Sequence, residues 1–152
     1  MKNKIFIESI EVSVLQSHEE KRPHWVSHFK VPSANELLIK IKSNEGHEGF
    51  GMATSYTNIK PIIEPFKNGI ADEIIGEDPF RPEKLYDKIF KFTDTRKSNE
   101  KKWSKEAIIR ISSALDIACW DLIGKSSKLP LYKLFGGFKN QVPCYVTCAY
   151  YR

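Results

Sequence analysis

The amino-acid sequence predicts an α+β fold, in which a three-stranded antiparallel meander is followed by a helical bundle. Two observations carry this prediction: apolar and polar residues alternate in the first third of the chain, and helical spacing with capping residues follows it. A chain of 152 residues corresponds to about one domain, and 41% hydrophobic with 28% charged residues is typical of a globular protein. We therefore expect one conventional hydrophobic core.

The strands come first. Residues 5–15 alternate at period two, with a phase slip near Ser9 that indicates a β-bulge. Residues 35–43, NELLIKIKS, alternate again. The run NEGHEGFGMATS then places Gly46, Gly49 and Gly51 where a hairpin turn leads into a third strand. Three antiparallel strands in succession form the meander.

Two helices are predicted next. The first begins with an N-cap at Asn58 and ends at the C-cap pair at positions 68–69, and Pro65 should kink or shorten it. The second has Asp78 as its capping residue and Pro82 near its first turn.

A long helix follows a polar loop over residues 93–104. Ser104 is the expected N-cap, the helix covers residues 105–123, and Gly124 ends it. A short helix in LPLYKLFGG and a final extended run, QVPCYVTCAYY, complete the chain.

Two carboxylates in the long helix are candidates for an acid/base pair. Asp116 and Asp121 are five positions apart, which places them about 140° apart around a helix axis. They cannot act as one pair, and we expect both to be structural. Asp121 should accept hydrogen bonds from backbone amides or pair with a cation such as Arg110 or Lys125.

Charge, hydropathy and cysteine content argue against several functional classes, namely nucleic-acid binders, exported or membrane proteins and zinc-binding proteins. The net charge of +5 is spread among interspersed lysines and glutamates, so a nucleic-acid binder has little in its favour. No signal peptide or membrane span is expected, which predicts a cytoplasmic protein. Cys144 and Cys148 lack a further ligand at zinc spacing, so we interpret the cysteines as buried small hydrophobes in a reducing compartment.

One stretch, SALDIACWDLIGKSSKLPLYKLFGG, resembles the last helices of the N-terminal capping domain in the mandelate racemase / muconate lactonizing enzyme group of the enolase superfamily. The resemblance extends to EGHEGFG, to IIGEDPF and to VPCYVTCAYY as a first barrel strand. It implies a capping domain over residues 1–140 and, at 141–152, the first strand of a (β/α)₈ barrel. Met52 replaces a glutamate and Lys128 a glycine that the family often has, and a left-handed Lys128 would carry about 1 kcal/mol of strain.

The resemblance also implies a mechanism. In these enzymes a Mg²⁺ ion bound by barrel carboxylates holds the substrate carboxylate, and a lysine or histidine removes the α-proton to give an enediolate. A complete barrel needs about 250 residues. We therefore expect no catalytic residue and no metal ligand in this chain, which alone should be inactive.

The letters KIK at Lys40 and Lys42 match the family's lysine base motif, but they belong to the second predicted strand. Alternation directs both amines to one solvated face, so we interpret them as non-catalytic.

Two segments correspond by position to the family loops that close over the substrate: residues 17–33 and residues 52–58. The first is rich in groups that can donate to a sugar acid, although an ordinary solvated loop is the alternative for each of them. The expected substrate-binding residues are His24, Trp25, Tyr56, Tyr150 and Tyr151.

The cationic polar loop favours an acid-sugar dehydratase as the parent enzyme, ahead of a racemase or cycloisomerase. The alternative from another class is a stand-alone ligand-binding or interaction module. The expected partners are a carboxylate small molecule, namely a sugar acid, the C-terminal barrel domain and further copies in a homo-oligomer, with neither nucleic acid nor membrane. An isolated chain should expose apolar surface and self-associate.

Overall fold

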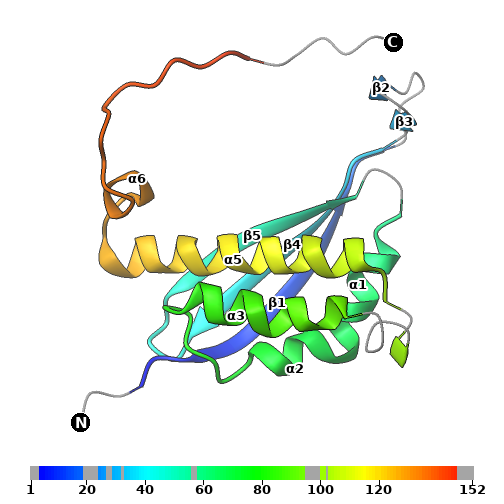
Figure 1. The fold of residues 1–152 in the computed structure, drawn as a ribbon, viewed down its shortest axis with the longest axis horizontal. Coiled ribbons are helices and arrows are strands. Elements are labelled where there is room, and N and C mark those ends of the chain that lie inside the picture. Colours follow the sequence, from blue (N-terminus) through cyan, green and yellow to red (C-terminus); the bar gives the residue numbers. More distant parts are fainter. Residues whose placement is uncertain are drawn as a thin grey trace.

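The computed structural model describes residues 4–18, 24–26, 29–31, 33–55, 58–94, 100–101 and 103–146. Three strands, β1 (Ile7–Gln16), β4 (Asn35–Ser43) and β5 (Glu48–Ser55), form an antiparallel sheet in the order β1-β4-β5. Helices cover one face of this sheet (Figure 1). The α+β meander predicted from the sequence is confirmed.

Strand β4 lies at the centre of the sheet and follows the predicted alternation. Its inward side chains, Leu37, Ile39 and Ile41, are fully buried. The pairing of β1 with β4 shifts register between Ile7 and Ser9, as the phase slip in the sequence predicts. Because every second residue faces the helices, this alternation fixes which side of the sheet forms the core.

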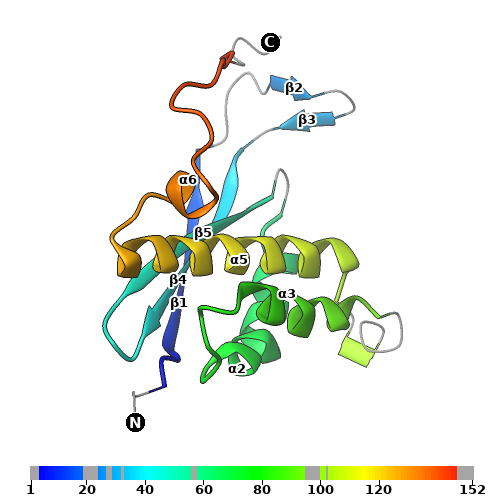
Figure 2. The same ribbon diagram turned by 60° about the vertical axis from the view of Figure 1, so that its left-hand side comes forward.

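A second, two-stranded sheet was not predicted. Strands β2 (His24–Val26) and β3 (Phe29–Val31) form an antiparallel hairpin within the segment interpreted as a loop. It extends beyond the end of the main sheet where β4 begins (Figure 2).

The first predicted helix breaks at its expected end, and further helical turns follow the break. Helix α1 (Lys60–Pro65) passes into a wider turn, η1 (Phe66–Ile70), and then into α2 (Ala71–Ile74). The backbone leaves helical geometry at Asn68 and Gly69, where φ is 144° at the glycine, so the break is real but local. The predicted stop at positions 68–69 is thus confirmed, and a second helical segment follows the kink, with Ile62, Phe66, Ile70 and Ile74 buried along the combined path.

The second predicted helix, α3 (Pro82–Phe90), continues into the short turn η2 (Lys91–Thr93). Pro82 occupies its first turn, as predicted. Asp78 does not cap it: its carboxylate accepts the Phe80 N–H at 2.9 Å and closes the preceding turn, and Arg81 is the N-cap residue.

The long helix α5 (Lys105–Ser127) begins as predicted, with the Ser104 hydroxyl accepting the Ala107 N–H at 3.1 Å. Its predicted end at Gly124 is wrong, since the left-handed residue that ends it is Lys128, with φ of 54°. Gly124 lies instead against Leu131 of α6 (Leu131–Leu134), where a side chain would crowd the packing.

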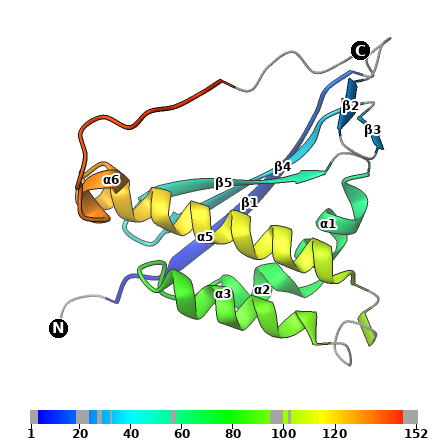
Figure 3. The same ribbon diagram turned by 45° about the horizontal axis from the view of Figure 1, so that its top comes forward.

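Helix α5 packs directly on β5, and two glycines permit this contact (Figure 3). A β-carbon at Gly49 would overlap the carbonyl oxygen of Ala118, and one at Gly51 would overlap that of Ala114. The hairpin turn itself needs only Gly46, whose φ is +84°.

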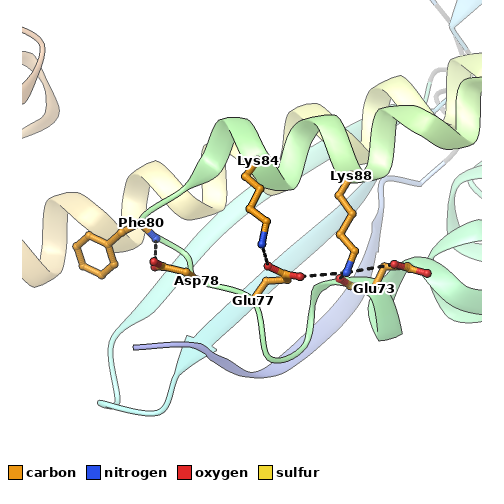
Figure 4. A network of polar contacts seen from close by, with 6 residues as sticks. All are labelled: Glu73, Glu77, Asp78, Phe80, Lys84 and Lys88. Atoms are coloured by element: carbon orange, nitrogen blue, oxygen red, sulfur yellow. Dashed lines mark hydrogen bonds and ion pairs between the residues drawn. The ribbon is translucent and has the colours of Figure 1, made fainter. Parts of the chain in front are cut away.

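An ion-pair network joins the end of α2 to α3 (Figure 4). The Glu77 carboxylate receives Lys84 at 2.7 Å and Lys88 at 3.1 Å, and Lys88 also lies 3.2 Å from the Glu73 carboxylate. Hydrogen bonds from Lys84 and then Lys88 hold the pKa of Glu77 below its ordinary value of 4.5.

A lowered folded-state pKa makes this network pH-dependent. Its stabilisation is present above pH 4.5 and is lost as pH falls through the lowered pKa of Glu77. We expect Glu77→Gln to lower the free energy of unfolding by about 1 kcal/mol at pH 7 and to have no effect once the wild-type carboxylate is protonated. Urea unfolding at several pH values measures this, with Glu45→Gln in an exposed turn as control. An equal loss at pH 7 and below pH 3 would contradict it.

After α6, residues 138–146 run in an extended path without helix or strand. The interpretation of residues 141–152 as a first barrel strand therefore stays a prediction, and residues 147–152 lie outside the described part. No helix in the described part of the chain is both long and apolar enough to cross a membrane.

Candidate functional site

The two segments predicted to cover a substrate leave the sheet at the same end of its strands. Gln16 of β1 pairs with Asn35 of β4, and Asn35 pairs with Ser55 of β5. The chain therefore departs toward β2 after Gln16, returns at Asn35, and departs again after Ser55. We refer to this end of the sheet, formed by Gln16, Asn35 and Ser55, as the loop edge.

The hairpin beyond the loop edge presents an aromatic ring and a cation together. Trp25 and Lys30 are cross-strand partners, and the lysine Nζ lies 5.1 Å from the centre of the indole ring. Trp25 is 52% exposed. An exposed indole can pack on a sugar ring while the neighbouring ammonium binds a carboxylate. Sequence reasoning missed Lys30, although the apolar residues Val26 and Phe29, separated by two positions, are typical of a tight hairpin.

Hydrogen bonds fix the base of this hairpin. Ser17 and Ala34 are linked by backbone and side-chain hydrogen bonds, from the Ser17 N–H at 2.9 Å and to the Ser17 hydroxyl at 2.8 Å. Asn35 is buried and donates to the Ser33 hydroxyl at 3.2 Å. The hairpin is thus held at its root by hydrogen bonds.

The second segment is shorter than predicted, because residues 52–55 belong to β5. Its ends are fixed by polar contacts: the Ser55 hydroxyl donates to the Asn58 carbonyl at 3.0 Å, and the Asn58 side chain accepts the Lys60 N–H at 3.0 Å. Arg110 of α5 donates to the Thr54 carbonyl and pairs with Glu106 at 2.8 Å.

The predicted binding residues can be placed only in part. Trp25 lies in β2 on the exposed face of the hairpin, and His24 lies next to it in the same strand, with only its backbone described. Tyr56, Tyr150 and Tyr151 lie outside the described residues. Met52, where the family often has a glutamate, is 52% exposed on β5 and brings no charge.

The two carboxylates of α5, Asp116 and Asp121, line the same cleft, yet they make different contacts. Asp121 accepts the Phe50 N–H at 2.9 Å and pairs with Lys125 at 2.6 Å, which confirms its structural role. Arg110 is not its partner, because eleven residues of helix separate the two by about 16 Å. Burial, and then the charge of Glu83, raise the pKa of Asp116.

Lys40 and Lys42 are not a catalytic pair. Lys40 lies 2.9 Å from Glu11 and 3.5 Å from Glu48, and Lys42 lies 3.6 Å from Glu8. The hydrogen bond with Glu11 is the main reason that the pKa of Lys40 is raised, which makes this amine a weaker base catalyst at neutral pH.

The thiols differ from the prediction at one position. Cys119 is buried, and burial raises its pKa to about 12, so it remains a protonated, unreactive thiol. Cys144 is exposed in the extended segment after α6, which corrects the interpretation of it as a buried residue. Among the described residues, no group of three or more His, Cys, Asp or Glu side chains could hold a metal ion.

Comparison with known proteins accounts for this architecture. The model of the mandelate racemase / muconate lactonizing enzyme N-terminal domain matches residues 9–136. Arabinonate dehydratase of Saccharolobus solfataricus is 32% identical over 123 residues, which cover 76% of this chain and 29% of that protein. L-talarate/galactarate dehydratase of Salmonella typhimurium is 31% identical over 117 residues, which cover 73% of this chain and 26% of that protein.

A third relative has a different activity. Hydrophobic dipeptide epimerase of Enterococcus faecalis is 32% identical over 123 residues, covering 74% of this chain and 29% of the relative. Each of these three relatives is thus much longer than the stretch it shares with this chain.

Solved structures agree in fold. L-talarate/galactarate dehydratase from Salmonella typhimurium, liganded with Mg and L-lyxarohydroxamate, has a TM-score of 0.73 and 27% identity, and the match covers 95% of this chain and 37% of that one. L-talarate dehydratase from Polaromonas, complexed with Mg and L-glucarate, has a TM-score of 0.71 and 26% identity. This match covers 93% of this chain and 38% of that one. Sequence and fold together place the chain in the mandelate racemase / muconate lactonizing enzyme family, as its N-terminal domain.

Proposed function

We propose that residues 1–140 are the capping domain of a cytoplasmic, Mg²⁺-dependent acid-sugar dehydratase, and that residues 141–152 are the first strand of its catalytic (β/α)₈ barrel. The reaction is abstraction of the α-proton of a carboxylate substrate, followed by loss of the β-hydroxyl. The observation that carries the proposal is the loop edge, where both substrate-covering segments leave the sheet together.

The chemistry of the hairpin supports a sugar acid as substrate. Trp25 supplies an exposed aromatic face, and the ammonium of Lys30 lies beside it. His24 adds a hydrogen-bonding group in the same strand, and Tyr56 follows the end of β5 directly in sequence. In this arrangement the capping domain selects the substrate and excludes water, and Tyr150 and Tyr151 contribute from the end of the barrel strand.

Mg²⁺ would polarise the substrate carboxylate and stabilise the charge that develops on loss of the α-proton. The described residues offer no group of three ligands for it. The family resemblance leads us to assign the metal ligands and the proton-transferring base to the barrel, and to assign this chain substrate contacts.

Racemisation or epimerisation, or cycloisomerisation, is the second candidate, favoured by the 32% identity to a hydrophobic dipeptide epimerase. The ammonium of Lys30 suits the carboxylate of either substrate, and the polar character of residues 17–33 favours a polyhydroxylated acid over a hydrophobic dipeptide. A stand-alone ligand-binding module remains the alternative outside enzymology.

Two experiments test the proposal. Sequencing the gene beyond codon 152 should reveal an in-frame barrel, and a stop codon there would favour the stand-alone module. The purified chain with Mg²⁺ should dehydrate none of galactarate, L-talarate or arabinonate, as measured by 2-keto acid formation, since the base is assigned to the barrel. Turnover by this chain alone would refute the division of labour.

The substrate contacts are tested in a chimera that joins residues 1–140 to the barrel of the Salmonella enzyme. Trp25→Ala should raise KM for the sugar acid by about tenfold, a loss of roughly 1.4 kcal/mol in binding. Tyr86→Ala, which removes a partly exposed ring from α3, is the control and should leave KM unchanged. An equal effect of both substitutions would contradict the assignment.

A further inference from the structure

The open face of the β2–β3 hairpin carries a cation that is not paired with any described carboxylate. Val31, the neighbour of Lys30 in β3, is only 2% exposed. Because successive side chains of a strand point to opposite faces, Lys30 lies on the open face, together with its cross-strand partner Trp25. Its ammonium contacts the indole ring of Trp25. The hairpin thus presents a positive charge and an aromatic ring side by side.

The lysines on the outer face of the main sheet have different surroundings. Lys40 lies 2.9 Å from the Glu11 carboxylate, and Lys42 lies 3.6 Å from that of Glu8, so both charges have a counter-charge within the domain. An aromatic ring attracts a cation but supplies no net charge. The ammonium of Lys30 therefore keeps most of its attraction for a negatively charged group that comes from outside the domain.

The proposed reaction places one carboxylate of the substrate at the metal ion of the barrel. Mg²⁺ neutralises that carboxylate, so a cation on the capping domain gains most from a second anionic group elsewhere on the same molecule. A neutral hydroxymethyl group in that place would leave the ammonium partly desolvated and without a counter-charge when the hairpin covers the substrate. A site of this kind selects for a charged end and against a neutral one.

We propose that Lys30 binds the carboxylate at the far end of a sugar diacid, and that Trp25 packs on the carbon chain between the two carboxylates. This inference rests on the proposed function, because it takes the metal of the barrel as the site of the reacting carboxylate. It makes Lys30 a specificity-determining residue. It also narrows the substrate class from sugar acids in general to those with a carboxylate at both ends.

Galactarate and D-galactonate test the inference, because they differ only at one end, where a hydroxymethyl group in D-galactonate replaces a carboxylate. Calorimetric titration of the chimera with Mg²⁺ measures both dissociation constants, and replacement of the proton-transferring base of the barrel by alanine prevents turnover. Lys30→Gln should raise the dissociation constant of galactarate by about tenfold and leave that of D-galactonate within about twofold. Lys30→Arg keeps the charge and should stay within about threefold of wild type for both acids. Trp25→Ala should weaken both acids alike, since they share the carbon chain.

A matched control separates the contact from net charge. Lys67→Gln removes the same charge at an exposed position of η1 and should leave both dissociation constants unchanged. If both acids bind, but Lys30→Gln weakens them equally or weakens neither, this inference is overturned while the proposed function stands. If neither acid binds, although the unmodified Salmonella enzyme binds galactarate, the proposed function and this inference fail together. The full-length enzyme from the extended gene takes the place of a chimera that circular dichroism shows to be unfolded.

Discussion

Replacement of Gly51 by alanine is expected to lower the free energy of unfolding by about 3 kcal/mol or more, enough to unfold a large fraction of a marginally stable domain. The added β-carbon would overlap the carbonyl oxygen of Ala114 in α5. Backbone cannot yield as the end of a flexible side chain can, so the whole helix would have to move off β5. Gly49→Ala should have a similar effect through Ala118.

Urea unfolding followed by circular dichroism measures this loss. Met52→Ala is the matched control, because Met52 lies between Gly51 and Ala53 in the same strand, yet its side chain faces solvent and is 52% exposed. Its loss should be below about 1 kcal/mol. If Gly51→Ala were as stable as Met52→Ala, the close contact between α5 and β5 would be refuted.

Ile39→Ala should cost about 2–5 kcal/mol, because Ile39 is fully buried at the centre of β4, between the other strands and under α5. The removed methyl groups leave a cavity that close-packed neighbours cannot fill. Ile39→Val removes only one methyl group and should cost about 0.5–1.5 kcal/mol.

The two substitutions form a graded series that thermal and urea unfolding can rank. The exposed residue Val14 of β1, which is 46% accessible, provides the control: Val14→Ala should change the free energy of unfolding by less than about 1 kcal/mol. A loss for Ile39→Ala no larger than that for Val14→Ala would show that the inward face of β4 does not form the core.

The parts of the fold that local sequence determines could be predicted from it. The alternation in residues 35–43 matches the observed bounds of β4, the phase slip near Ser9 matches the register shift in β1, and Ser104 caps α5. Each of these features depends on neighbours within a few positions. The residues concerned also have one dominant physical preference, which no distant contact opposes.

Distant contacts explain the errors. Gly49 and Gly51 were predicted to belong to a turn. They are instead required because α5, more than sixty positions away in sequence, packs too closely on β5 to leave room for a side chain. Gly124 was predicted to end the helix. It is instead a site of close packing against α6, and the left-handed residue that ends the helix is Lys128. A glycine marks either conformational freedom or close approach, and only the tertiary partner distinguishes the two.

The sequence predicted which two segments form the candidate site, but not how their residues lie relative to one another. The sequence identifies Trp25 as a candidate aromatic contact. The pairing of β2 with β3 places Lys30 beside it, and this pairing could not be predicted because the polar residues around the two short strands give no clear alternation. Tyr56, Tyr150 and Tyr151 stay predictions.

The β2–β3 hairpin pairs only with itself among the described strands, and hydrogen bonds at Ser17 and Ala34 form its root. We therefore expect substitutions at exposed positions of the hairpin, such as Trp25 and Lys30, to leave the packing of α5 on the sheet unchanged. Under the proposed function, the β2–β3 hairpin could therefore change its substrate contacts during evolution at little cost to the stability of the domain.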